Sequence, residues 1–101
     1  MITEDICPVV SAIPAGRENA VTRSELALRL GLSDRKTREL IESARREGHI
    51  IINDQDSRGY YRSIDPDDME RQYRQDTNRA LSILARRKEL RRALKAAGRE
   101  V

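Results

Sequence analysis

Few residues of this chain have the type and spacing that covalent chemistry requires. His49 stands alone, without the carboxylate, cysteine or second histidine that a catalytic or metal site needs. The acidic run in residues 65–68 is explained by helix capping, because proline and acids stabilise a first helical turn. No nucleophile–base pair, phosphate-binding glycine loop or nucleotide fingerprint is found. We therefore expect no enzymatic activity, no metal ion and no cofactor.

Electrostatic recognition is better supported than catalysis. The chain carries 20 Lys and Arg residues against 17 Asp and Glu residues. Residues 71–101 hold ten of the basic residues against Asp76, Glu89 and Glu100, a balance of +7, which leaves −4 for residues 1–70. Such asymmetry predicts a helix or tail that meets an anion, either a nucleic acid or an acidic protein surface. The alternative is a solvated helix face.

Cysteine content and the N-terminus bear on location. The single Cys7 allows no intramolecular disulfide and indicates a reducing compartment. Glu4 and Asp5 stand where a signal peptide would be basic, and Pro8 interrupts the apolar run that follows. We expect a cytoplasmic protein without a membrane span. Its 101 residues suffice for one small core.

Capping residues and apolar periodicity predict three short helices. The first contains Ile6, Val9, Val10 and Ile13 and starts either at a Thr3 cap or at Cys7, since Pro8 fits only a first turn. Residues 20–22 are expected as a very short strand. A Thr22–Glu25 capping box predicts the start of the second helix, and Gly31 predicts a tight turn at its end. Ser33 is expected to cap a third helix that runs to Glu47. The positions expected to face inward are Leu26, Ala27 and Leu30 in the second helix and Thr37, Leu40, Ile41 and Ala44 in the third.

A hairpin and a long helix complete the chain. Residues 50–52 and 60–64 predict two strands around a polar turn at 53–59. A helix is expected from Pro66, and no glycine or proline interrupts it before Gly98. A kink or helical hairpin at residues 76–79 is an alternative. The apolar positions of this helix form one stripe, interrupted by Asp76, Thr77 and Arg87, that consists of Met69, Tyr73, Ala80, Ile83, Leu84, Leu90 and Leu94.

The order of these elements is that of a winged helix. Residues 21–50, followed by 51–63, resemble the winged helix-turn-helix domains of biotin-type repressors and of many small bacterial and phage regulators. The most specific part is Ala27-x-x-x-Gly31-Leu32, with Leu40 completing the packing. Thr37 stands where such motifs more often carry Val or Ile. The resemblance implies a mainly α fold with a small β-hairpin, in which a winged helix-turn-helix at residues 1–64 precedes a long basic helix at 65–101.

The resemblance also implies a regulator, of transcription or of phage-type replication or excision, that binds double-stranded DNA. The helix at 34–47 would enter the major groove, where arginine bonds guanine edges. Arg35 and Arg38 are the first candidates for base contacts; ion pairs with Glu39 and Glu42 are the alternative. Arg58, at the tip of the hairpin, would reach phosphate or the minor groove. The full set of expected contact residues is Ser33, Arg35, Lys36, Arg38, Glu39, Glu42 and Arg58.

The sequence also allows partners other than DNA, namely a second copy of the chain, another protein or RNA. We expect a homodimer, because a core of this size cannot cover the long helix. The interruptions argue against a long parallel seam and favour an antiparallel or splayed contact within residues 80–94, made by Ile83, Leu84, Leu90 and Leu94. One rival is a protein-interaction module, such as a phage accessory factor that grips a host protein through the long helix. The other is an RNA binder that uses the arginine-rich residues 86–92.

Overall fold

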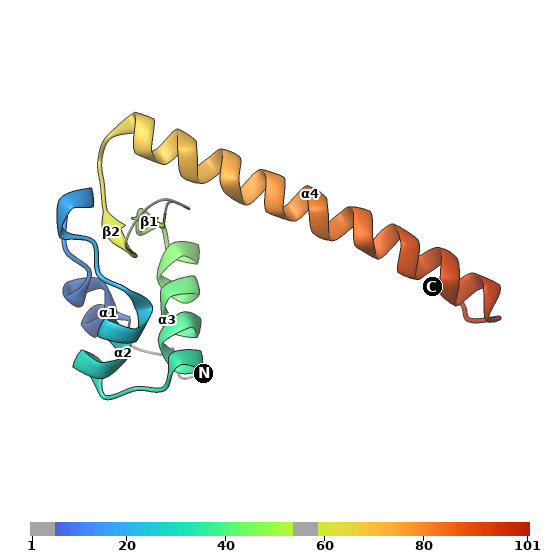
Figure 1. Cartoon of the computed structure of the whole chain (residues 1–101), viewed down its shortest axis with the longest axis horizontal. Helices are drawn as coiled ribbons and strands as arrows, with labels where there is room; N and C mark the ends of the chain where they lie inside the picture. Colours follow the sequence, from blue (N-terminus) through green and yellow to red (C-terminus); the bar gives the residue numbers. More distant parts are fainter. Residues whose placement is uncertain (1–5, 54–58) are drawn as a thin grey trace.

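The chain folds into a mainly helical body with one antiparallel hairpin and a long C-terminal helix (Figure 1). The computed structural model describes residues 6–53 and 59–101. Its elements follow the expected order, with a 3₁₀ turn at Arg17–Asn19 in addition. They are α1 (Cys7–Ala12), α2 (Arg23–Leu30), α3 (Asp34–Arg46), β1 (Ile51–Ile52), β2 (Tyr61–Arg62) and α4 (Pro66–Ala96).

The three short helices pack around one apolar core. Helix α1 starts at Cys7 with Pro8 in its first turn, so the second of the two expected starts is confirmed. The Thr22 side chain accepts a hydrogen bond from the backbone N–H of Glu25 at 3.1 Å, which is one half of the expected capping box. Fully buried side chains from each helix meet in the core, among them Val9, Ile13, Leu26, Ile41 and Ala44.

Gly31 makes the turn between α2 and α3. Its φ of 65° is left-handed, a conformation that glycine adopts without a Cβ penalty. The backbone N–H of Leu32 then donates to the carbonyl of Ala27 at 3.0 Å, so the end of α2 is satisfied by the turn itself. Ser33 caps α3 as expected, accepting from the backbone N–H of Lys36 at 3.0 Å.

The hairpin is shorter than the sequence predicts, and a third segment extends it. Strands β1 and β2 pair Ile51 with Arg62 and Ile52 with Tyr61. The expected strand at residues 20–22 is reduced to a single bridge, in which the backbones of Val21 and Tyr60 exchange hydrogen bonds of 3.0 and 2.7 Å. The sheet therefore ties the loop before α2 to the segment that leads into α4.

Helix α4 is one continuous helix through Ala96, so the expected alternative of a kink or helical hairpin at residues 76–79 is wrong. Asp65 caps it, accepting from the Asp67 backbone N–H at 3.0 Å. It touches the body near its start, where Gln72 contacts the hairpin; from Asp76 onward every residue is exposed. Figure 1 shows the remainder of α4 projecting away from the three-helix body. Among the described residues, no helix has the length and apolar content that crossing a membrane requires.

Candidate functional site

Helix α3 has one buried face and one exposed face. Thr37, Leu40, Ile41 and Ala44 are buried against the core. The Thr37 hydroxyl donates to the Ser33 carbonyl at 2.9 Å, so the hydroxyl that departs from the usual apolar residue is satisfied inside the helix. The opposite face is solvent-exposed and carries Arg35, Arg38, Glu39, Glu42 and Arg46.

Two ion pairs involve the glutamates of this face, and Arg38 takes part in neither of them. Arg35 Nε lies 3.2 Å from Glu39 Oε1, which is one of the i, i+4 pairs that the sequence offers. Glu42 pairs with Arg45 at 3.2 Å instead of with Arg38. Within residues 6–53 and 59–101, Arg38 forms no ion pair. Because exposed pairs of this kind contribute at most about 1 kcal/mol, Arg35 can also exchange its partner for a stronger anion.

Arg45 holds the end of α3 against the hairpin. Its guanidinium donates to the Ile51 carbonyl through Nε at 3.2 Å and through Nη2 at 3.1 Å. Its Cζ also lies 5.7 Å from the centre of the Tyr60 ring, a distance at which a cation is attracted to an aromatic face. The sequence does not single out Arg45, because its partners are distant backbone and ring atoms.

A further ion pair, between Arg23 and Asp34, fixes the start of α3 relative to α2. Arg23 Nε donates to Asp34 Oδ1 at 2.6 Å. The Asp34 carboxylate raises the pKa of the Arg23 guanidinium, with a further hydrogen bond to Tyr60 acting in the same direction. Together with Arg45, this pair sets the orientation in which α3 presents its exposed face.

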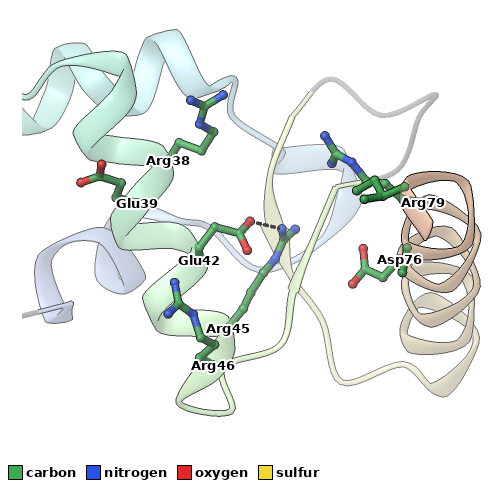
Figure 2. Close-up of a pocket in the computed structure, with 9 residues that line it drawn as sticks. Arg38, Glu39, Glu42, Arg45, Arg46, Asp76 and Arg79 are labelled. Carbon is green, nitrogen blue, oxygen red and sulfur yellow. Dashed lines mark hydrogen bonds and ion pairs between the residues drawn. The ribbon is translucent and has the colours of Figure 1, made fainter. Parts of the chain in front are cut away.

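A groove of about 730 Å³ separates α3 from α4. Figure 2 shows Asp76 and Arg79 reaching from α4 toward the α3 side. Among the described residues, neither Arg46 nor Arg79 forms an ion pair. With Arg38, three arginines that have no ion pair with a described residue therefore line the groove. Its lining consists of Arg38, Glu39, Glu42, Arg45, Arg46, Asp76, Arg79, Ala80 and Ile83.

No family model, curated protein or solved structure matches the chain. The function is therefore inferred from the geometry of α3, the groove and α4.

The expected contact residues do not all lie together. Arg38, Glu39 and Glu42 line the groove, whereas Ser33 and Lys36 are at the start of α3. Arg58 lies outside the described residues. Sequence reasoning missed Arg46 and Arg79, because only the path of α4 past α3 brings them to one groove. A basic residue at each of these positions was the only available signal.

Two other features of the site are relevant to its chemistry. In the part of the chain that the structure describes, no group of three or more His, Cys, Asp or Glu side chains is placed to hold a metal ion. His49 lines a small apolar pocket of about 210 Å³ beside the start of α4, together with Ile50, Met69 and Tyr73 among others.

Proposed function

We propose that the chain is a winged-helix protein that binds double-stranded DNA with sequence preference and acts as a regulator of transcription or of another DNA transaction. The observation that carries this proposal is the exposed face of α3, where Arg38 has no ion pair with any described residue while the opposite face is buried in the core. A helix of about 10 to 12 Å diameter fits the major groove, which is about 12 Å wide.

The arrangement of the body supports the winged-helix part of the proposal. Helices α2 and α3 are joined by the Gly31 turn, and each packs on α1. The Val21 bridge sets a third segment beside the hairpin, in the order helix, strand, helix, helix, hairpin. In such a domain the third helix is the one presented to DNA, and the hairpin reaches the flanking backbone.

The side chains of the exposed face divide into two roles. Arg38 would bond a guanine edge with two donors, and Arg35 would join it by leaving Glu39. Glu39 and Glu42 would accept from cytosine amino groups. Ser33 and Lys36 would contact phosphate at the start of α3, and the contact expected of Arg58 remains a sequence prediction. Arg46 and Arg79, in the groove, would neutralise phosphates beside the reading helix and would carry no base preference.

Binding-site selection from random duplexes, followed by titration of the selected site, tests the proposal. Arg38→Ala should weaken binding by about 1 to 3 kcal/mol and relax the preference at one base pair. Arg74→Ala is the matched control, because Arg74 is exposed on α4, outside the groove lining, and pairs with Glu70 at 2.6 Å. It removes the same charge and should leave the preference intact.

Three outcomes would reject the proposal. A folded protein that binds no duplex at low salt would favour a protein partner. Tighter binding of RNA than of DNA at equal salt would favour the RNA-binding alternative, with α4 as the contact. An Arg38→Ala variant that retains both the affinity and the preference of the wild type would show that α3 does not read the bases.

A further inference from the structure

The outer part of α4 exposes large apolar side chains that the rest of the molecule does not cover. Leu81, Ile83, Leu84, Leu90 and Leu94 are between 41% and 65% exposed. Patches of this kind on a water-exposed helix mark surfaces that bind a partner. The identity of the partner follows from how the polar residues within the stripe are spaced.

One row of α4 repeats at alternating steps of three and four residues. It contains Met69, Tyr73, Asp76, Ala80, Ile83, Arg87, Leu90 and Leu94, which we call the seam. This 3.5-residue spacing is the one that lets two helices pack along their length. Asp76 and Arg87 are the only charged members. Any partner helix must therefore offer a positive group at one of these points and a negative group at the other.

A second copy of α4 meets this requirement only when it runs antiparallel. When Asp76 of one copy is set opposite Arg87 of the other, the symmetry sets Arg87 opposite the second Asp76. The same alignment sets Ala80 opposite Ile83, Tyr73 opposite Leu90, and Met69 opposite Leu94. A parallel pair would set Asp76 against Asp76 and Arg87 against Arg87, which repel each other.

Most of the seam is exposed to solvent: Tyr73 and every seam residue from Asp76 onward are exposed, whereas Met69 is half-buried beside the body. The α4 residues with printed hydrogen bonds to the body or to the segment before α4 are Asp68, Arg71, Gln72 and Gln75. Of these, Asp68, Gln72 and Gln75 form a row adjacent to the seam, and this row continues to Arg79. Within the seam, Tyr73 is 71% exposed. Asp76, Ala80 and Ile83 of the seam also line the groove beside Arg79, so a helix paired on the seam would border the groove on its α4 side.

An apolar pocket lies where the partner's leucines would arrive. The pocket of about 210 Å³ is lined in part by Ile50, Met69 and Tyr73, and Ile50 is 43% exposed. Met69 and Tyr73 are the seam residues that the antiparallel alignment sets opposite Leu94 and Leu90 of the second copy. The alignment chosen from charge alone thus also brings leucines to an unfilled apolar pocket.

We propose that the protein forms a homodimer through antiparallel pairing of the α4 seams, with Asp76 of each copy bonded to Arg87 of the other and with Leu90 and Leu94 covering the apolar pocket of the facing body. The occupant of the seam is therefore a second copy of this chain. The pairing does not require DNA, so it can be tested separately from the proposed function.

Charge reversal with sedimentation equilibrium of the full chain tests the register. The wild type should be dimeric at micromolar concentration. Asp76→Arg and Arg87→Asp should each raise the dimer Kd about tenfold or more, since like charges then face each other twice. The double variant should return the Kd to within about threefold of the wild type. Lys88→Asp is the matched control, because Lys88 is next to Arg87 but outside the seam, and it should change the Kd by less than about threefold.

The four variants also separate the alternatives. A wild type that is monomeric at micromolar concentration, with the helix intact by circular dichroism, overturns the proposal. A double variant whose dimer Kd is as high as that of the single variants overturns the antiparallel register. Exchanging the two charges restores attraction only where position 76 of one copy faces position 87 of the other, and in a parallel pair it restores none. These sedimentation measurements are made without DNA, and duplex binding is measured in a separate titration. A dimer that binds no duplex would therefore contradict the proposed function alone, and a monomer that binds a duplex would contradict the dimer alone.

Cross-linking provides a second readout that does not depend on charge. In a Cys7→Ser background, which removes the single native cysteine, Ala80→Cys mixed with Ile83→Cys should oxidise to a covalent dimer. Arg87→Cys alone should not, because the two substituted positions lie far apart in the antiparallel pair. Efficient cross-linking of Arg87→Cys alone, with none in the mixture, would indicate a parallel pair and overturn the proposal.

Discussion

Gln72 Oε1 accepts a hydrogen bond from the backbone N–H of Asn53 at 2.8 Å, which joins α4 to the hairpin. Gln72 is one of two polar side chains that are buried among the described residues. Its amide nitrogen donates to Asp76 Oδ1 at 2.9 Å, and Gln75 donates to the Asn53 carbonyl at 3.0 Å. Both backbone groups of Asn53 are thus satisfied by α4, so the long helix leaves the body in a fixed direction.

Gln72→Ala should therefore loosen α4 from the body. The substitution leaves the Asn53 N–H without its acceptor, and we expect a loss of about 1 to 2 kcal/mol in the free energy of unfolding. Urea denaturation measures the loss, and amide hydrogen exchange should show faster exchange at Asn53. Asn78→Ala is the control, because Asn78 is exposed on the same helix. Unchanged exchange at Asn53 in the Gln72 variant would show that other contacts hold the helix.

Gly59 and Gly31 should respond differently to alanine. Both have positive φ, of 140° and 65°. A Cβ at Gly59 would overlap the carbonyl oxygen of Val21, whereas a Cβ at Gly31 would meet nothing within 4 Å. We expect Gly31→Ala to cost about 1 to 2 kcal/mol, which is the left-handed backbone penalty alone. Gly59→Ala should cost about 3 kcal/mol or more, because the Val21 bridge must also break.

Urea denaturation of both glycine variants gives the comparison, with hydrogen exchange of the Val21 amide as a local probe. That amide donates to Tyr60 at 3.0 Å and should lose protection only in Gly59→Ala. Equal losses of stability in the two variants would contradict the steric argument.

Local signals in the sequence were enough to predict most of the helices. The side chains of Thr22 and Ser33 cap α2 and α3 within three residues of their own positions, and the turn at Gly31 depends on one residue's φ. The Asp65 cap and Pro66 likewise start α4. Each of these interactions is nearly contiguous in the chain, so spacing alone reveals it.

Contacts between distant residues could not be predicted in the same way. Val21 pairs with Tyr60 and Gln72 with Asn53, and nothing in a single valine or glutamine indicates such a partner. The groove is missed for the same reason, because Arg46 and Arg79 belong to helices whose relative placement is set by these contacts. The exposed face of α3 was predictable, since the buried positions of an amphipathic helix define the opposite face.

The start of α4 should give the protein an acid-sensitive contribution to stability. A hydrogen bond from the Ser63 hydroxyl to Asp68 Oδ2, 2.6 Å long, is the main cause of a lowered pKa for Asp68, and Arg71 acts in the same direction. A carboxyl group whose pKa is lower in the folded state stabilises that state above its ordinary pKa, about 3.9. This stabilisation is lost as the pH falls from about 4 through the lowered value.

Asp68→Asn should therefore reduce the free energy of unfolding by about 1 to 2 kcal/mol near pH 7, and the difference from the wild type should shrink below about pH 4. Urea denaturation at a series of pH values measures it. Asp67→Asn is the control: Asp67 is also in the first turn of α4, and its loss should cost at most about 1 kcal/mol through the helix dipole. A difference between Asp68→Asn and wild type that persists undiminished at pH 2.5 would exclude the carboxylate as its source.

The groove arginines should determine the salt dependence of DNA binding if α3 lies in the major groove. Each phosphate that a cation neutralises releases condensed counterions, so the slope of log K against log salt changes by about 0.9 for each contact. Arg46→Ala and Arg79→Ala should each reduce the slope by about 1, and the double variant by about 2. Neither should change the selected sequence, because phosphate contacts carry no base information.

Arg74→Ala removes the same charge from α4 outside the groove lining and should leave the slope unchanged. Fluorescence anisotropy from about 50 to 200 mM salt measures all four variants. Equal reductions in every variant would show that the basic charge acts without a defined path, and unchanged slopes in Arg46→Ala and Arg79→Ala would place the duplex elsewhere on the molecule.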